Sequence, residues 1–445
     1  MRALRLLAVA AGLVALAATA GSTSRAASDA APVRAAAVAA GLAHTCVLTA
    51  AGAVSCWGYN GHDELGNGQT GGSVTPVAVA GMSTGIANIS VGVRHSCAVT
   101  SVGGVKCWGY GRGALGDGTI ERRRTPVDVV GLASGVTAVA AGYDVGCALV
   151  QSGGVKCWGA KHLAPVDVPG LASGVKAIAA GGLRTCALMV GGNVQCWGSD
   201  LVAVDVPGLA GATAITASCA LTASGGVECW GSSGAPADVP GLASGVIAIT
   251  SSFHSCALLA SGSVKCWGSN QHGELGDGTR IDRPTPVDVV GLHGPVAAVS
   301  AGSFHTCALL RSGAVDCWGS DATQQLPDGT PVDHLRPVAV AGFGVAKATL
   351  AIVSRTIPVT RGRVAPVHVR CGSALRCRGT LELAALHARL ASRAFSIPAG
   401  AAEAVPVTLT RRGYENVLRS KRLAAHVGVT GAVTASRAVI LVAPS

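Results

Sequence analysis

The sequence predicts an all-β protein, a seven-bladed β-propeller followed by a small β-sandwich. Three observations lead to this prediction. A unit with a fixed internal spacing of two cysteines and Trp-Gly recurs seven times, and short strand-like runs flank a hairpin in each unit. Glycine is also frequent, with 62 of 445 residues, which favours turns over long helices. Aromatic residues make up only 3% of the chain, so its cores must be built from alanine, valine and leucine. Apolar residues reach 49% and charged residues only 13%, which excludes a disordered chain.

Residues 1–26 are typical of a secretory signal peptide. Arg2 and Arg5 precede the apolar run Leu6–Ala20, which is too short to span a bilayer. Ala18-Thr19-Ala20 offers a cleavage site, with Ser24-Arg25-Ala26 as a later alternative. An uncleaved membrane anchor is the alternative interpretation. We therefore expect the protein to be secreted or displayed at the cell surface, where disulfides persist, with no transmembrane segment in the mature chain.

The recurring unit contains two cysteines separated by nine residues, and Trp-Gly follows the second cysteine in every copy. All seven tryptophans of the chain occupy this position, so the agreement cannot be chance. The cysteine pairs are Cys46/Cys56, Cys97/Cys107, Cys147/Cys157, Cys186/Cys196, Cys219/Cys229, Cys256/Cys266 and Cys307/Cys317.

A glycine six residues after the first cysteine explains the spacing. Gly52 can adopt the left-handed conformation that ends a three-residue hairpin loop, which places Cys46 directly opposite Cys56. The two Cα atoms would then be about 4.5–5.5 Å apart, within disulfide range. A zinc site is the competing interpretation, but its ligands are usually two to four residues apart. We expect seven disulfides and a buried disulfide face on each hairpin. The residue before the second cysteine is usually polar, as in Lys106 and Lys156, so we expect the Trp face to be partly open to solvent at that level.

Two further strand-like runs flank each hairpin. Ala/Val/Ile runs such as Ala138–Gly142 precede it, and Pro-Val-x-Val-x-Gly-Leu runs such as Pro126–Leu132 and Pro286–Leu292 follow it. Four short strands in each of seven units predict a propeller over residues 33–343. A solenoid is the alternative, but neither end of the array looks like a polar cap.

The repeat motifs resemble those of a known family. Gly-x-x-His-Thr-Cys-Ala-Leu, Gly-x-Val-x-Cys-Trp-Gly, Gly-x-Leu-Gly-Asp-Gly-Thr and Thr-Pro-Val-x-Val-x-Gly-Leu are similar to the regulator of chromosome condensation repeat, in its secreted, cysteine-paired bacterial form. This resemblance implies a seven-bladed propeller. It does not fix a function, because propellers serve many functions.

Four of the seven repeats carry an insert after Trp-Gly, and these repeats are neighbours in a closed ring. The inserts are Gly61–Thr70, Gly111–Thr119, Gln271–Thr279 and Gln324–Thr330. Loops commonly carry function, so we expect a binding surface on this raised arc, with ordinary solvated loops as the alternative. The candidate binding residues are Tyr59, Tyr110, Arg112, Arg122, Arg123, Arg124, Arg280 and Asp282.

Residues that suggest catalysis are better explained by the repeat. His44, His95, His254 and His305 share one repeat position, which is typical of a structural role. The Leu-Gly-Asp-Gly-Thr loops, with Asp117 and Asp277, lack the alternating acidic ligands of a calcium loop, and turn chemistry accounts for them. Without a nucleophile–base arrangement or a phosphate-binding loop before a helix, we expect no enzyme, no cofactor and no metal.

Residues 345–445 form a separate, basic region. It holds 15 Lys/Arg against three acidic residues, whereas residues 33–344 are mildly acidic. Arg411–Arg422 could include a helical turn. Five alternating stretches suggest strands, namely Ala348–Val353, Pro366–Val369, Thr380–Leu383, Val405–Leu409 and Ala438–Val442. Cys371 and Cys377 are expected to pair around a turn. The region loosely resembles immunoglobulin-like sandwich tails of secreted actinobacterial proteins.

The favoured function is a non-catalytic extracellular scaffold that binds a protein or a cell-wall glycan through propeller loops. The basic tail could bind an anionic wall polymer, and its few aromatic residues argue against a nucleic-acid partner. Guanine-nucleotide exchange on a small GTPase, which the family resemblance implies, is an alternative, but export would place the protein on the wrong side of the membrane. A propeller hydrolase or lyase is a further alternative.

Overall fold

The computed structural model describes residues 33–159, 161–231, 235–326, 332–344, 350–371, 377–385, 388–397, 401–431 and 435–444. The predicted signal peptide at 1–26 lies outside these residues. Only the backbone of Cys371 and Cys377 is described, so the predicted pairing of these two cysteines also falls outside the described part of the chain. The described helix is not long and apolar enough to cross a membrane.

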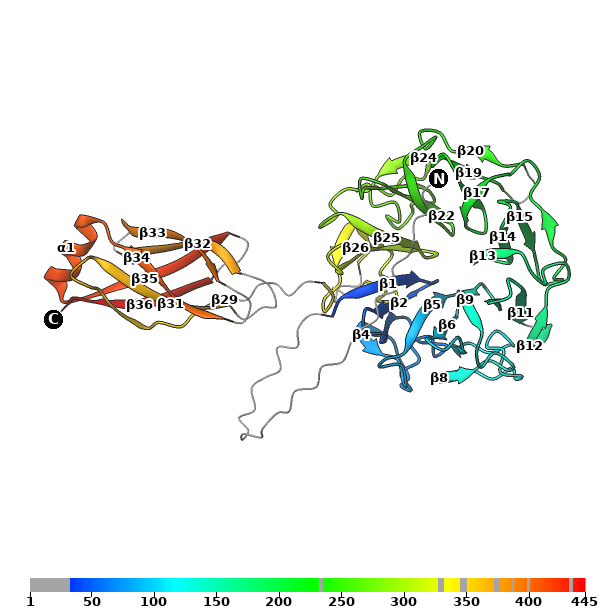
Figure 1. The fold of residues 1–445 in the computed structure, drawn as a ribbon, viewed down its shortest axis with the longest axis horizontal. Helices are drawn as coiled ribbons and strands as arrows, with labels where there is room; N and C mark the ends of the chain where they lie inside the picture. Colours follow the sequence, from blue (N-terminus) through cyan, green and yellow to red (C-terminus); the bar gives the residue numbers. More distant parts are fainter. Residues whose placement is uncertain are drawn as a thin grey trace. The chain divides into compact units, whose positions relative to one another are not determined.

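Seven four-stranded antiparallel sheets, here called blades 1 to 7, make up the first region, and their first strands lie innermost in the ring (Figure 1). Blade 1 contains β1 (Ala35–Ala40), β2 (His44–Thr49), β3 (Val54–Gly58) and β4 (Ser73–Ala78), and blade 2 contains β5 (Ile86–Val91), β6 (His95–Thr100), β7 (Val105–Gly109) and β8 (Arg123–Asp128). Blade 3 contains β9 (Val136–Ala141), β10 (Val145–Val150), β11 (Val155–Gly159) and β12 (His162–Asp167), and blade 4 contains β13 (Val175–Gly181), β14 (Arg184–Met189), β15 (Val194–Trp197) and β16 (Val204–Asp205). Blade 5 contains β17 (Ala212–Ile215), β18 (Cys219–Thr222), β19 (Val227–Cys229) and β20 (Ala237–Asp238), and blade 6 contains β21 (Val246–Ser251), β22 (His254–Leu259), β23 (Val264–Gly268) and β24 (Arg283–Asp288). Blade 7 contains β25 (Val296–Ala301), β26 (His305–Leu310), β27 (Val315–Gly319) and β28 (His334–Ala339).

The predicted hairpin forms the middle of every blade. In blade 1, Cys46 pairs with Cys56, and Gly52 closes the loop with a φ of 78°. All seven predicted disulfides of the propeller are confirmed. They join Cys46 to Cys56, Cys97 to Cys107, Cys147 to Cys157, Cys186 to Cys196, Cys219 to Cys229, Cys256 to Cys266 and Cys307 to Cys317. Their Cα–Cα separations of 4.0–4.1 Å are slightly shorter than the expected range.

A β-bulge follows the second cysteine of the hairpin in five blades, and the sequence analysis did not anticipate it. The pairing with the fourth strand shifts register between Cys56 and Gly58, Cys107 and Gly109, Cys157 and Gly159, Cys266 and Gly268, and Cys317 and Gly319. Four of these five glycines have φ between 101° and 108°, a conformation that a side chain would oppose. The bulge therefore gives a backbone reason for the glycine of the repeated Trp-Gly.

The fourth strand begins earlier than the sequence suggested. β8 covers Arg123–Asp128 and β24 covers Arg283–Asp288, so the prolines expected to begin these strands, Pro126 and Pro286, lie near their ends. Each fourth strand is the outer edge of its blade, where the missing N–H of proline breaks no ladder hydrogen bond.

The Trp face of the hairpins is closed at most tryptophans and partly open at the residue before the second cysteine. Trp57, Trp108 and Trp318 are fully buried, because each blade lies between two others and both of its faces are covered. One core cluster, for example, joins Cys46 and Cys56 of blade 1 to Trp108 of blade 2. The residue before the second cysteine is half-buried at Lys106, Lys156 and Lys265, so the prediction that the Trp face is partly open at that level is confirmed there.

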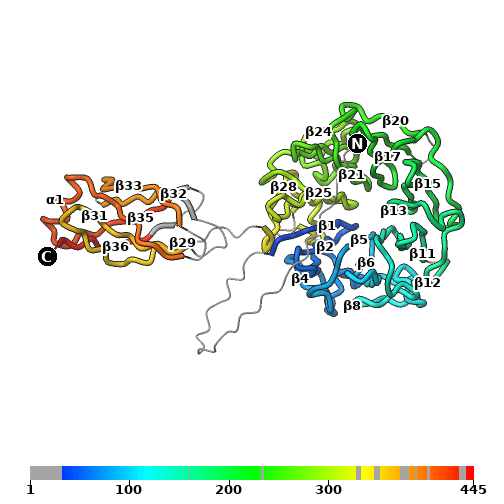
Figure 2. The backbone as a smooth tube through the Cα atoms, viewed as in Figure 1, coloured from blue at the N-terminus to red at the C-terminus, as the bar shows by residue number. Residues whose placement is uncertain are grey.

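Blades 1 and 7 meet without exchanging strands. Val33 forms a parallel bridge with Phe343, and the Ala35 amide donates to the Gly313 carbonyl at 3.1 Å. The Trp57 and Phe343 rings pack with centroids 6.0 Å apart. Each blade is thus built from one continuous stretch of sequence, as the backbone trace in Figure 2 also shows.

The second region is a β-sandwich with one short helix. One sheet has the order β29-β31-β34 and the other the order β30-β36-β35-β32-β33. Apolar residues from both sheets, including Val367, Val407, Leu381 and Val427, share one core. The elements are β29 (Leu350–Ile352), β30 (Thr356–Pro358), β31 (Val364–Cys371), β32 (Cys377–Ala385), β33 (Ala388–Ile397), β34 (Ala402–Thr408), α1 (Arg411–Ser420), β35 (Arg422–Gly431) and β36 (Ala435–Val442).

Candidate binding face of the propeller

The turns between the first and second strands and the segments between the third and fourth strands lie at the same end of each blade. The Tyr59 amide donates to Ala43 O at 2.8 Å, and the Tyr110 amide donates to Arg94 O at 2.9 Å. We call this end of the propeller the loop face. The four inserts predicted from the sequence belong to it.

The inserts are anchored between blades rather than raised above them. Each insert has a fully buried leucine at the same position, namely Leu65, Leu115, Leu275 and Leu326. The carbonyl just before each leucine accepts a hydrogen bond from the indole N–H of the next blade. These bonds are Trp108 to Glu64 O (2.8 Å), Trp158 to Ala114 O (2.8 Å), Trp318 to Glu274 O (2.7 Å) and Trp57 to Gln325 O (2.9 Å).

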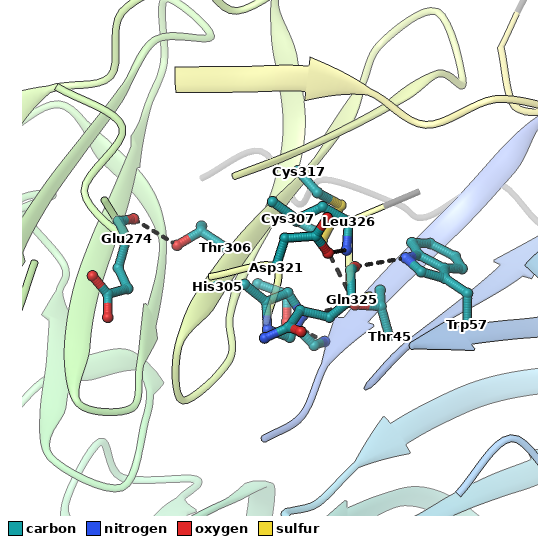
Figure 3. The surroundings of a disulfide bond; sticks show 12 residues. Thr45, Trp57, Glu274, His305, Thr306, Cys307, Cys317, Asp321, Gln325 and Leu326 are labelled. Carbon is teal, nitrogen blue, oxygen red and sulfur yellow. Dashed lines mark hydrogen bonds between the residues drawn. A yellow bond between two sulfur atoms is a disulfide. The ribbon is translucent and has the colours of Figure 1, made fainter. Parts of the chain in front are cut away.

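Figure 3 shows this anchoring where blade 7 meets blade 1. The Trp57 indole points to Gln325 O, and the Leu326 amide donates to Asp321 Oδ1 at 2.7 Å. On the neighbouring junction, Thr306 donates to Glu274 O at 2.8 Å. A good part of each insert therefore serves to fill the space between two blades.

Asp117 and Asp277 hold turns, as predicted. Asp117 Oδ1 accepts from both the backbone amide and the hydroxyl of Thr119, and Arg123 donates to Asp117 Oδ2 at 2.7 Å. Partial burial opposes ionisation, but the hydrogen bonds from Thr119 and Arg123 outweigh it and lower the pKa of Asp117. Arg123 is thus committed to its own loop, although the sequence suggested it as a binding residue.

The most concentrated group of candidate side chains lies on blades 1 to 3. We call it the tyrosine–arginine cluster, and it consists of Tyr59, His62, Arg94, Tyr110, Arg112 and Tyr143. The Arg94 guanidinium carbon is 5.6 Å from the Tyr110 ring centre and 5.5 Å from the Tyr143 ring centre, and that of Arg112 is 6.0 Å from the Tyr110 centre. His62 packs against Tyr110 with centroids 4.9 Å apart and against Tyr59 at 5.9 Å.

Arg122 and Arg124 border this cluster from blade 2. Their Nε atoms lie 3.6 and 3.5 Å from the two carboxylate oxygens of Asp63, which is buried in the insert of blade 1. Both arginine side chains are about half exposed. These ion pairs tie the inserts of blades 1 and 2 together.

Arg280 and Asp282 lie elsewhere, on blade 6 at its border with blade 7. Arg280 donates to Asp333 Oδ2 at 2.6 Å and to Gln271 O at 2.9 Å. Asp282 Oδ1 accepts from the Asn270 amide at 2.7 Å, which is a contact within its own loop. The predicted arc therefore separates into two groups, and Tyr59, Tyr110 and Arg112 belong to the larger one.

Sequence reasoning missed His62, Arg94 and Tyr143. Arg94 and Tyr143 lie just before the repeated histidine position, in the turn between the first and second strands. The available signal was that this turn varies between repeats: it carries Arg94 in blade 2, but Phe253 and Phe304 in blades 6 and 7. Those phenylalanines are 66% and 37% exposed and add an apolar patch to the loop face.

The four repeated histidines are structural. His44 is hydrogen-bonded to Ser96, His254 to Thr306 and His305 to Thr45, each on the next blade around the ring. Burial lowers the pKa of His44 and His254 to about 3 and that of His95 and His305 to about 4, so all four are neutral at pH 7. At His95, the corresponding position on the next blade is Gly146, which has no hydroxyl to bond the imidazole.

Blades 3, 4 and 5 lack inserts, and hollows open there instead. A hollow of about 480 Å³ is lined by Trp197, Asp200, Val202 and Trp230, among others. A more enclosed one of about 290 Å³ lies between blades 3 and 4 and is lined by Cys157, Thr185 and Leu201, among others. Within the described ranges, no group of three His, Cys, Asp or Glu side chains could hold a metal ion.

Comparison with known proteins identifies the repeats. Models of the regulator of chromosome condensation (RCC1) repeat match residues 261–309 and, in a second version, residues 35–64, 175–201, 247–274 and 296–325. The chain is 34% identical over 76 residues to the ultraviolet-B receptor UVR8 of Arabidopsis thaliana, covering 17% of each protein. It is 45% identical over 62 residues to the E3 ubiquitin-protein ligase MYCBP2 of Danio rerio, covering 14% of this chain and 1% of the ligase. The chain therefore matches less than a fifth of the length of either relative.

Solved structures share the fold. Prp20p from Saccharomyces cerevisiae, described with its binding to Gsp1p and histones, superimposes with a TM-score of 0.57 at 20% identity, covering 69% of this chain and 87% of Prp20p. Yeast RCC1 (Prp20) bound to Kap60 gives a TM-score of 0.57 at 19% identity, covering 74% and 91%. The chain contains regulator of chromosome condensation repeats, and its seven four-stranded sheets match the RCC1 β-propeller.

Proposed function

We propose that this protein is a non-catalytic extracellular scaffold that binds a protein partner through the loop face. The tyrosine–arginine cluster is the observation that carries this proposal. Tyrosine and arginine are enriched at the centres of protein–protein interfaces, where they contribute most of the binding energy. Here they lie together on neighbouring blades, and Arg112 and Tyr59 are exposed.

The frame behind the loops supports the same function. Seven disulfides fasten the hairpins, and buried inserts fasten four of the blade junctions. A rigid frame lowers the entropy lost when loops bind a ligand, which raises affinity without new contacts. A protein is favoured over a glycan as ligand, because the two RCC1 structures with the same fold are described with protein partners.

Disulfide density supports an extracellular location, since such bonds persist in oxidising compartments. We further propose the domain organisation of a signal peptide at 1–26, a propeller at 33–343 and an immunoglobulin-like domain at 345–445. In the last of these, basic side chains such as Arg355, Arg370 and Arg412 are exposed. This charge suits contact with an anionic wall polymer.

An affinity capture experiment tests the binding proposal. The full chain is immobilised and exposed to secreted proteins and to purified cell-wall material, and the same is done with a Tyr59→Ala, Arg112→Ala double variant. The Lys156→Ala variant is the control, because Lys156 is ion-paired with Asp167 on β12, in a blade without an insert. The proposal expects a protein captured by the native chain and the control but not by the double variant. Equal capture by all three would contradict the assignment of the cluster.

A further inference from the structure

Two buried tryptophans at the blades without inserts lack the hydrogen bond that four other tryptophans of the repeat make. The indole nitrogens of Trp197 and Trp230 are inaccessible to solvent and have no hydrogen-bond partner among the described residues. The two side chains are only 3% and 4% exposed. An unpaired buried N–H costs about 1–3 kcal/mol, so an acceptor placed there would be stabilising.

The repeat shows what that acceptor is elsewhere in the ring. Trp108, Trp158, Trp318 and Trp57 each donate to a backbone carbonyl in the insert of the preceding blade. Trp197 and Trp230 follow blades 3 and 4, which have no insert. The absent insert is thus the direct reason that these two N–H groups are unpaired.

At three of the four junctions the insert supplies three features, in the local order X-Leu-Gly, whereas the insert of blade 7 has Gln325-Leu326-Pro327 in this place. The carbonyl of X accepts from the indole, and the leucine fills the space between the blades. The glycine lies against the indole ring: a Cβ atom at Gly66 would come within 2.5 Å of Trp108, and one at Gly276 within 2.8 Å of Trp318. This segment therefore defines a short recognition element of three consecutive residues. The first supplies a backbone carbonyl, the second supplies an apolar side chain, and the third is a glycine.

Space for such a segment is present beside the unpaired tryptophans. The hollow of about 480 Å³ is bordered by Gly198 and Asp200, in the short connection of blade 4, and by Trp230 of blade 5. A second hollow, of about 290 Å³, is bordered by Gly159 and Lys161 in the short connection of blade 3 and by Thr185 of blade 4, and the tryptophan that lines it is Trp158 rather than Trp197. Thr185 occupies the position of Thr306, whose hydroxyl donates to the insert carbonyl Glu274 O.

We propose that blades 3 to 5 bind an X-Leu-Gly loop of a partner protein, which takes the place of the absent inserts. The X carbonyl accepts from the Trp230 or Trp197 indole, and the leucine enters the adjoining hollow. The loop comes from another protein, because Leu-Gly occurs in this chain only at 65–66, 115–116 and 275–276, where it is already buried. The inference deepens the proposed binding function and rests on it for its biological meaning.

Indole N–H resonances provide a direct test. The full chain is labelled with ¹⁵N-tryptophan, and the resonances of Trp197 and Trp230 are assigned with the W197F and W230F variants. The probe is a synthetic peptide with the sequence of residues 269–281, and the control peptide carries Leu275→Asp. We expect saturable downfield shifts at Trp230 or Trp197 with the probe only, while the resonance of Trp108 stays in place.

The W230F variant should weaken binding of the probe about threefold to tenfold if Trp230 is the donor, which is the effect of losing one hydrogen bond. In the native protein the Trp108 indole is already hydrogen-bonded within the chain, so the W108F variant should bind the probe as the native protein does. No saturable shift at millimolar probe, or equal shifts with both peptides, would overturn the inference. Self-association of the chain that produces the same shifts would replace the partner loop by a second copy and would also overturn it.

The two proposals can fail separately. If capture of the natural partner is lost in the Tyr59/Arg112 double variant but unchanged in W197F and W230F, the proposed function stands and this inference fails. If the probe peptide binds at Trp230 but the full chain captures nothing, the recognition element stands and the proposed function fails.

Discussion

Four buried histidines should make the propeller sensitive to mild acid. Each is neutral in the folded protein, with a pKa lowered to about 3 for His44 and His254 and to about 4 for His95 and His305, from an ordinary value of 6.5. Below pH 6.5 the unfolded chain therefore binds protons that the folded chain does not. Stability falls as the pH drops from about 6.5 towards the folded values.

The size of the effect follows from these values. At pH 5, protonation of one such histidine in the unfolded chain lowers the free energy of unfolding by about 2 kcal/mol relative to pH 8. Four independent sites would sum to about 8 kcal/mol, which is comparable to the entire stability of many domains, about 5–15 kcal/mol. Protonation of the four histidines in the unfolded chain therefore shifts the unfolding transition of the propeller towards mildly acidic pH.

The prediction is tested with a His254→Gln variant, which keeps a polar side chain near Thr306 but cannot be protonated. Guanidinium unfolding is followed at pH 8 and pH 5 by tryptophan fluorescence, which reports on the propeller alone because all seven tryptophans lie between Trp57 and Trp318. The drop in unfolding free energy between the two pH values should be about 2 kcal/mol smaller in the variant than in the native protein. The exposed His162→Gln change should leave the drop as it is. An equal drop in native protein and H254Q would refute the buried-histidine reasoning.

Three further predictions concern stability. Trp108→Phe should lower the free energy of unfolding by about 1–3 kcal/mol because it removes the indole that donates to Glu64 O, whereas Trp230→Phe should lower it less or raise it. Equal losses of stability in thermal unfolding would contradict the difference between the two junctions. Gly52→Ala should lower the free energy of unfolding by about 1–2 kcal/mol, since φ is 78° and the new Cβ would lie 2.9 Å from Gly85 N. Gly231→Ala, where the new Cβ meets open space, should be nearly neutral, and the reverse order in chemical denaturation would count against the hairpin assignment. Replacing Cys147 and Cys157 together by alanine should lower stability by about 2–3 kcal/mol under non-reducing conditions, and an unchanged unfolding midpoint would argue against a stabilising role for the bond.

Local spacing was sufficient for most of the fold. The offset between Cys46 and Cys56, with Gly52 in the left-handed region, fixed the hairpin register that the structure has. In the second region, the prediction of a helical turn at Arg411–Arg422 corresponds to α1, but β30, β33 and β35 were not anticipated as strands. The residues of β33 and β35 mix charged and small side chains, and the place of these strands in the sheet follows from long-range pairing rather than from alternation.

The candidate site was predicted only in part. Tyr59, Tyr110 and Arg112 do lie together, whereas Arg123 and Asp282 serve contacts within their own loops. Nothing in the sequence distinguishes an arginine that packs on a tyrosine from one that holds a turn, because the difference depends on which side chains the neighbouring blade brings near it. Arg94 and Tyr143 joined the cluster for the same reason.

The sequence by itself determined the number of blades, because the repeated units can be counted along the chain. It also determined the pairing within each hairpin and the seven disulfides, because these depend on residues ten positions apart or fewer. Tertiary structure alone decided the contacts between blades, since Trp108 meets Glu64 only when blades 1 and 2 pack together, and Trp57 meets Gln325 only when the ring closes. Packing between blades also buries four histidines and leaves two indole N–H groups unpaired where inserts are absent. Contacts between distant residues depend on the summed geometry of all the blades, which no local pattern contains.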